Sequence, residues 1–161
     1  MADFRLNTQI KRQCQAFRRG FFDLIDQSWL VMFAPRELQT LLSGSDRPID
    51  LKDMKQHTVY GGVYHADHPT IKMFWSAVES LTDDQLRDLL KFVTSCRLPP
   101  LLGFGYLNPK FAVSAGGDEE MRLPTAATCM NLLKLPQYSD EATLRAKLLM
   151  SITSNSGFEL S

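Results

Sequence analysis

The chain lacks a long hydrophobic run, a dense basic cluster and a disulfide-like pattern of cysteines. No stretch of about 18 uncharged apolar residues occurs, so we expect no membrane partner. A formal net charge of zero disfavours nucleic acid as a partner, and the first residues lack the apolar core of a secretory signal. Three widely spaced cysteines argue against a disulfide framework and favour a reducing compartment. We therefore expect a cytoplasmic protein, with the nucleus as a second compartment.

Apolar residues recur at spacings of three and four near the start of the chain, which is the pattern of an amphipathic helix. This stripe runs from Leu6 to Ile25 and continues, with a break, towards Ala34. Cys14 lies on the stripe, so we expect its side chain to be buried and unreactive.

Further helices are predicted from proline positions and capping residues. Thr82 and Gln85 have the spacing of a capping box, and Cys96 falls near the end of the helix that they open, where a structural role is expected. Gly157 is the expected stop of the last helix. These helices are expected to begin at Pro35, near Leu51, at Pro69, after Thr82 and near Ser139.

Short apolar runs bounded by glycine, proline and asparagine follow Pro99 and Pro100, and they predict strands. The expected strands are 101–107, 111–114 and 130–135, the last opened by Cys129. Earlier in the chain, the glycines within residues 61–68 predict either a flexible connector between two domains or an ordinary loop with turns. Helices followed by a small sheet indicate an α+β fold.

The most informative segment is residues 123–136, LPTAATCMNLLKLP. A lone cysteine in an apolar segment is more often a small core residue than a nucleophile. Here the cysteine follows a threonine and lies between two Leu-Pro pairs, which favours a displayed side chain for Cys129.

This segment resembles the active-site segment of HECT-type ubiquitin ligases, in which a Thr-Cys pair precedes an apolar residue and an asparagine. Residues 92–104 are similar to the family's link between a helix and the first strands of its carboxyl-terminal lobe. Residues 157–161, GFELS, are similar to the family's terminus, with Phe158 fourth from the end. Ala127 stands where the family often has histidine, which argues against a histidine-assisted mechanism.

The resemblance implies two parts of one catalytic domain: residues 1–64 as the end of the amino-terminal lobe and residues 65–161 as the carboxyl-terminal catalytic lobe. It implies that Cys129 accepts ubiquitin as a thioester and passes it to a substrate lysine. The implied partners are ubiquitin, a ubiquitin-conjugating enzyme, protein substrates and, from similarity to the proteasome-associated branch, the proteasome. No metal and no cofactor are expected.

Most of the family's amino-terminal lobe, which docks the conjugating enzyme, has no counterpart in the chain, so we expect a truncated ligase. The alternative is a non-catalytic module that binds ubiquitin or a full-length ligase.

Several side chains are candidates for helping the transfer. Thr128 either donates a hydrogen bond to the thioester carbonyl or caps the loop. An acceptor lysine has a pKa of about 10.4 and must lose a proton, so a carboxylate near Cys129 would help. Glu159 and the terminal carboxylate of Ser161 are the candidates, with residues 118–120 as weaker ones; the alternative for each is a solvated surface charge. By resemblance, Phe158 places the tail for this step.

Overall fold

The computed structural model describes residues 9–43 and 47–154. The chain divides into two compact units, Met1–Leu42 and Ser43–Ser161. Both helices and a small sheet are present, so the expected α+β class is confirmed.

The described part of the first unit consists of helices. Asp26 separates α1 from α2, because its carboxylate accepts a hydrogen bond from the Ser28 N–H and caps α2. No residue of α1 or α2 is buried, and Phe17 is 69% exposed. The expectation of a buried Cys14 is therefore wrong: Cys14 is exposed, because no described element of the first unit covers the apolar face of α1. The helices are α1 (Lys11–Leu24), α2 (Gln27–Leu30) and α3 (Pro35–Ser43).

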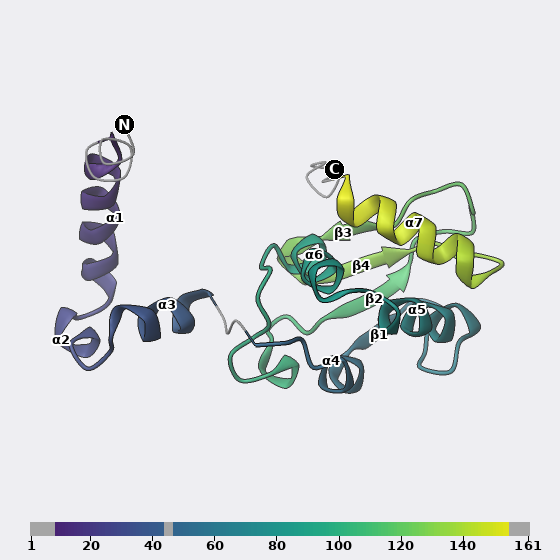
Figure 1. Ribbon diagram of the computed structural model, residues 1–161, viewed down its shortest axis with the longest axis horizontal. Helices are drawn as coiled ribbons and strands as arrows, with labels where there is room; N and C mark the ends of the chain where they lie inside the picture. Colours follow the sequence, from purple (N-terminus) through teal and green to yellow (C-terminus); the bar gives the residue numbers. More distant parts are fainter. Residues whose placement is uncertain (1–8, 44–46, 155–161) are drawn as a thin grey trace. The chain divides into compact units, whose positions relative to one another are not determined.

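The second unit is built on a four-stranded sheet with the order β1-β2-β4-β3 (Figure 1). β1, β2 and β4 are parallel, and β3 runs antiparallel to β4. The sequence predicts β2 and β4 but neither β1 nor β3, because a strand of three residues is too short to show an alternating pattern. The strands are β1 (Val59–Gly61), β2 (Ala112–Ala115), β3 (Thr125–Ala127) and β4 (Leu132–Leu135).

The helices of this unit begin where the sequence places them, because side chains cap their first turns. Asp50, His68 and Asp140 each accept a hydrogen bond from a backbone N–H of the following helix. Thr82 and Gln85 form the predicted capping box. The helices are α4 (Leu51–His57), α5 (Pro69–Glu79), α6 (Asp83–Thr94) and α7 (Glu141–Thr153).

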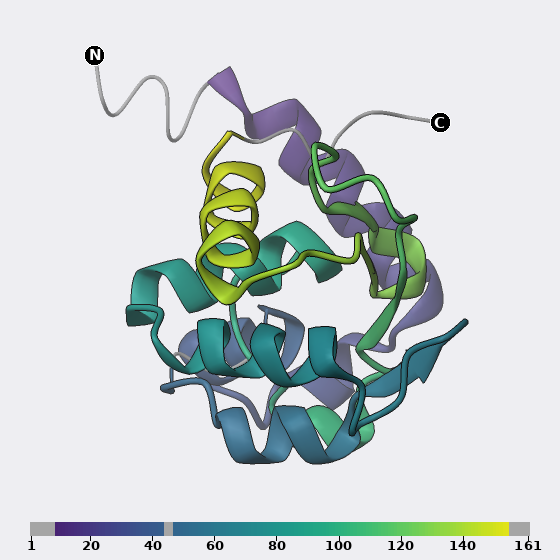
Figure 2. The ribbon, with the colours of Figure 1, turned by 90° about the vertical axis from the view of Figure 1, so that its right-hand side faces the viewer.

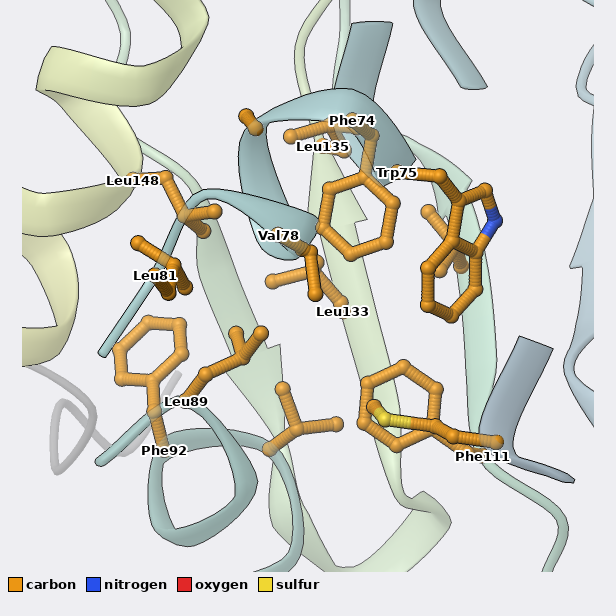
Figure 3. Close-up of a cluster of buried hydrophobic side chains, with 14 of the residues drawn as sticks. Phe74, Trp75, Val78, Leu81, Leu89, Phe92, Phe111, Leu133, Leu135 and Leu148 are labelled. Carbon is orange, nitrogen blue, oxygen red and sulfur yellow. The ribbon is translucent and has the colours of Figure 1, made fainter. Parts of the chain in front are cut away.

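The core lies between the sheet and α5, α6 and α7. α5 and α7 pack against each other, as the turned view in Figure 2 also shows. Leu133 and Leu135 of β4 are fully buried and point towards these helices, whereas Lys134 between them is exposed (Figure 3). This alternation is the period of two that a sheet with one covered face requires. The helices contribute Phe74, Trp75, Val78, Leu89, Phe92, Leu144 and Leu148.

The strand expected over residues 101–107 is wrong. Gly103 has a φ of +91°, and the chain continues into a short 3₁₀ helix, η2 (Phe104–Tyr106). The Asp53 carboxylate accepts a 2.7 Å hydrogen bond from the Phe104 N–H. A Cβ atom at position 103 would lie 2.8 Å from the same carboxylate, so only glycine fits this turn.

Residues 61–68 lie within the second unit. Gly61 pairs with Ser114 across β1 and β2, and Gly62 takes a left-handed φ of +68°. Tyr64 is only 4% exposed, and its hydroxyl donates a hydrogen bond to the Leu135 carbonyl. These contacts favour the ordinary loop over the flexible connector. The division into lobes after residue 64 rests on the resemblance and stays a prediction.

Candidate active site

Cys129 lies in a one-turn 3₁₀ helix, η3 (Thr128–Met130), which connects β3 to β4. The sequence predicts that the last strand begins at this residue, but β4 begins three positions later, at Leu132. The strand register places η3 at the end of the sheet where β2 and β4 begin, because Leu132 pairs with both Ala112 and Ala127. Cys129 is exposed, as its sequence context predicts.

Asn131 ends this turn and anchors it to a neighbouring segment of the same chain. Its φ of +49° is left-handed, a conformation that asparagine tolerates better than most residues. Its N–H donates to the Thr128 carbonyl at 3.2 Å, and its own carbonyl accepts from the Ala112 N–H at 2.9 Å. The side chain is 7% exposed, and Nδ2 donates to the Pro109 carbonyl at 2.6 Å. The turn that carries Cys129 is therefore tied to residues 109–112.

The Thr128 hydroxyl does not cap this turn. Within residues 9–43 and 47–154, no hydrogen bond of its side chain is found, and the turn has no side-chain cap. Thr128 is half-buried beside an exposed cysteine. The capping alternative therefore receives no support from the described residues, and the hydroxyl stays a candidate donor.

The three histidines lie elsewhere in the second unit. His57 pairs with Asp53, with 2.8 Å between Nδ1 and Oδ1, and His68 caps α5 with its ring 5.7 Å from that of His65. They belong to the segments around β1 and α5, and β1 is the opposite edge strand from β3. Among the described residues, the Cys129 thiol has no hydrogen-bond partner, which agrees with the absence of a histidine at position 127.

The acidic residues 118–120 lie at the far end of the sheet from Cys129. They follow the carboxyl end of β2, whereas η3 precedes the amino end of the parallel strand β4. Four residues of strand separate these ends by about 10 Å, well beyond hydrogen-bond reach. The Glu120 carboxylate instead accepts a 2.7 Å hydrogen bond from the Ser139 N–H. The interpretation of residues 118–120 as acids near the nucleophile is therefore wrong.

Two buried phenols hold the chain at that far end. The Tyr138 hydroxyl donates to the Arg122 carbonyl at 2.7 Å, and the Tyr64 hydroxyl donates to the end of β4. Burial raises the pKa of Tyr64 to about 12, and the negative charge of Asp118 adds to this increase. Burial also raises the pKa of Tyr138. This end of the sheet is structural, since its polar groups are used in holding the loop.

The predicted tail residues Phe158 and Glu159 lie outside the described residues, as do Gly157 and Ser161. The last described helix, α7, ends at Thr153. The role of the tail therefore stays a prediction.

Two kinds of feature are absent from residues 9–43 and 47–154. No group of three histidine, cysteine, aspartate or glutamate side chains there could hold a metal ion. None of the helices in those residues combines the length and apolar character needed to cross a bilayer.

The whole chain, residues 1–161, matches a family model described as HECT-domain (ubiquitin-transferase). The chain belongs to the HECT-domain family. This HECT-domain chain is 47% identical over 161 residues to a probable E3 ubiquitin protein ligase of Schizosaccharomyces pombe. It is 46% identical over 166 residues to E3 ubiquitin-protein ligase UPL6 of Arabidopsis thaliana. It is 44% identical over 161 residues to E3 ubiquitin-protein ligase HUL5 of Saccharomyces cerevisiae.

The three relatives each cover 100% of this HECT-domain chain, which spans only 16%, 16% and 18% of their own lengths. The match therefore concerns about one sixth of each relative.

The sequence contains one further signal about the site. Asn131, two residues after the cysteine, belongs to the family-like segment, but only its hydrogen bonds in the structure show what it does.

Proposed function

We propose that this chain accepts ubiquitin as a thioester on Cys129 and transfers it to the lysine of a protein substrate. The observation that carries the proposal is an exposed cysteine on the turn η3, in a chain that matches the HECT-domain (ubiquitin-transferase) family over its whole length. A thiol displayed on a turn can meet the carboxyl terminus of another protein, which a thiol in the core cannot.

The first step is a thioester exchange. The Cys129 thiolate attacks the carbonyl carbon of an activated ubiquitin carboxyl terminus, a new C–S bond forms, and the old C–S bond breaks to release the donor thiol. The exchange is nearly isoenergetic because one thioester replaces another. Cysteine is an intrinsically good nucleophile, so placement of the carbonyl can supply most of the rate. The proposed donor of activated ubiquitin is a ubiquitin-conjugating enzyme.

The second step needs a neutral amine and a stabilised oxyanion. The substrate lysine attacks the thioester carbonyl, the C–S bond breaks, and the amine proton passes to a base or to solvent. We assign the Thr128 hydroxyl to the developing oxyanion, because it is adjacent to Cys129 and has no hydrogen bond among the described residues. The proposed roles of the tail are placement of the acceptor by Phe158 and proton removal by Glu159.

A non-catalytic module that binds ubiquitin or a full-length ligase is the second candidate. What favours it is the absence, within the described residues, of a hydrogen-bonded acid or base at the Cys129 thiol. The relatives' names describe E3 ubiquitin ligases, and this chain spans only 16–18% of their lengths. Protein substrates and a proteasome partner therefore belong to this chain only as parts of the proposal.

The test uses ubiquitin whose carboxyl terminus is a thioester of a small thiol, mixed with the chain and separated on a non-reducing gel. The wild-type chain should form an adduct that reducing agent removes, and Cys129→Ala should abolish it. Cys14→Ala and Cys96→Ala are matched controls, because both cysteines are also exposed, and they should keep the adduct. Persistence of the adduct in Cys129→Ala would overturn the enzyme assignment in favour of the module.

A pulse-chase of the loaded adduct with free lysine separates the second step from the first. Phe158→Ala should load ubiquitin normally and release it to lysine more slowly, because only the second transition state includes the acceptor. Loss of loading in Phe158→Ala, with the fold intact by circular dichroism, would remove the role proposed for the tail.

A further inference from the structure

The orientation of the Cys129 side chain depends on the main chain of its turn. The residue is exposed, and its thiol has no hydrogen-bond partner among residues 9–43 and 47–154. No hydrogen bond from a side chain of the described part therefore fixes the sulfur. The direction of its Cα–Cβ bond follows from the backbone of Thr128–Met130, so whatever holds that turn also holds the nucleophile.

Asn131 holds the turn through three hydrogen bonds. Its main-chain N–H closes the turn on Thr128, and its main-chain carbonyl joins the turn to Ala112 at the start of β2. Its Nδ2 donates to the Pro109 carbonyl at 2.6 Å, the shortest of these three bonds, from a side chain that is 7% exposed. Breaking this bond would leave both the buried amide of Asn131 and the Pro109 carbonyl without a partner. The bond therefore constrains both segments.

Resting on the proposed function, we infer that Asn131 is the positioning residue of this site: its buried amide, bonded to Pro109, aims the Cys129 thiol at the incoming thioester. Asn131 touches neither ubiquitin nor the reacting atoms in this role. Attack on a carbonyl requires the sulfur within about 3.5 Å and along a narrow approach, and a misplacement of about 1 Å can cost about a hundredfold in rate. A small alkylating reagent has no such requirement, because it diffuses to the sulfur from any open side.

This difference gives a test that a purely structural residue would not pass. Asn131→Gly keeps the left-handed backbone at no steric cost but removes the amide. Asn131→Asp keeps the side-chain shape but removes the donor. Asn108→Asp is the matched control, since it makes the same chemical change at an exposed residue next to Pro109. Two rates are measured on each folded chain: adduct formation with the small-thiol ubiquitin thioester, and alkylation of Cys129 by iodoacetamide.

Both Asn131 variants should form the adduct at least about tenfold more slowly than wild type, while alkylation of Cys129 changes by less than about threefold. Asn108→Asp should match wild type in both rates. Adduct formation at the wild-type rate in both Asn131 variants would overturn the inference and leave the proposed function standing. So would loss of near-ultraviolet circular dichroism in both variants, which would assign Asn131 to folding alone. No adduct on the wild-type chain would overturn the proposed function and the inference together.

Discussion

Helices α1 and α6 carry the same kind of apolar stripe and differ in what covers it. α6 buries Leu86, Leu89, Leu90, Phe92 and Val93, whereas α1 buries none of its residues. Both stripes repeat every three to four residues, so the spacing predicts a helix and its apolar face equally well in each. Periodicity therefore indicates which side of a helix can be covered, whereas burial requires a partner element at the right place.

The ends of the two helices differ in the same way. α6 begins with a capping box at Thr82 and ends with Ser95 in a left-handed conformation. α1 is preceded by Ile10, which makes no side-chain cap. A capping side chain contributes about 1 kcal/mol to helix stability. α6 is therefore stabilised both locally and by packing, and α1 has neither contribution.

The largest expected effect comes from truncating one apolar side chain on each of the two helices. Leu89→Ala should lower the free energy of unfolding of the second unit by about 2–5 kcal/mol, because it leaves a cavity at a residue that is 1% exposed. Phe17→Ala should change it by less than about 0.5 kcal/mol, since Phe17 lies on an uncovered face. Urea unfolding followed by Trp75 fluorescence measures both, in a Trp29→Phe background.

Trp75 suits this measurement because it is 2% exposed, whereas Trp29 is 61% exposed and belongs to the first unit. Equal destabilisation by Leu89→Ala and Phe17→Ala would break the comparison, because it would require the α1 face to be covered in solution.

The second-largest expected effect is a loss of stability of the second unit at alkaline pH. All four tyrosines lie after residue 42, and burial raises the pKa of Tyr64 to about 12 and also raises that of Tyr138. An unfolded phenol titrates near pH 10, so stability should be unchanged below pH 10 and fall as pH rises towards the folded values. Each phenol contributes a slope of up to about 1.4 kcal/mol per pH unit in this range.

The measurement is urea unfolding of the second unit at several pH values from 8 to 12. Tyr64→Phe should show a shallower decline above pH 10 than wild type, because one titrating group is removed. Tyr106→Phe is the matched control, since it makes the same chemical change at a residue that is 75% exposed. A decline that begins below pH 9 would assign the effect to other groups.

The smallest expected effect concerns the cysteines. The sequence predicts that Cys129 is alkylated well before Cys14 and Cys96, but all three cysteines are exposed. We expect their iodoacetamide alkylation rates in the folded chain to agree within about tenfold, measured by mass spectrometry of timed samples. The urea-unfolded chain supplies the reference rates. Labelling of Cys14 a hundredfold slower than Cys129 would show that the α1 face is covered after all.

Local signals predicted most of the helices and part of the sheet. Proline at a first turn and capping side chains placed the starts of α3, α5, α6 and α7, because these signals act within a few residues of chain. β1 and β3 were not predicted, since each has only three residues. β1 exists only through pairing with β2, and β3 only through pairing with β4. The apolar run 101–107 misled the prediction because Asp53, some fifty residues earlier, bends it at Gly103 and Phe104.

At the candidate site, too, local sequence signals predicted some features and not others. The Thr-Cys pair within a family-like segment identified Cys129 and Thr128 from the sequence alone, and the structure confirmed that Cys129 is exposed. The proposed roles of these residues and of the tail stay predictions. The sequence could not place the acidic residues 118–120, because their separation from Cys129 follows from the parallel direction of β2 and β4.

By itself, the sequence determined the helices with strong caps, the identity of the candidate nucleophile and membership of the HECT-domain family, because all three depend on residues close together in the chain. Only the tertiary structure decided which apolar faces are covered, which end of the sheet carries Cys129, and that the amide of Asn131 holds its turn. These features depend on contacts between distant segments, and such contacts leave no periodic or local mark in the sequence.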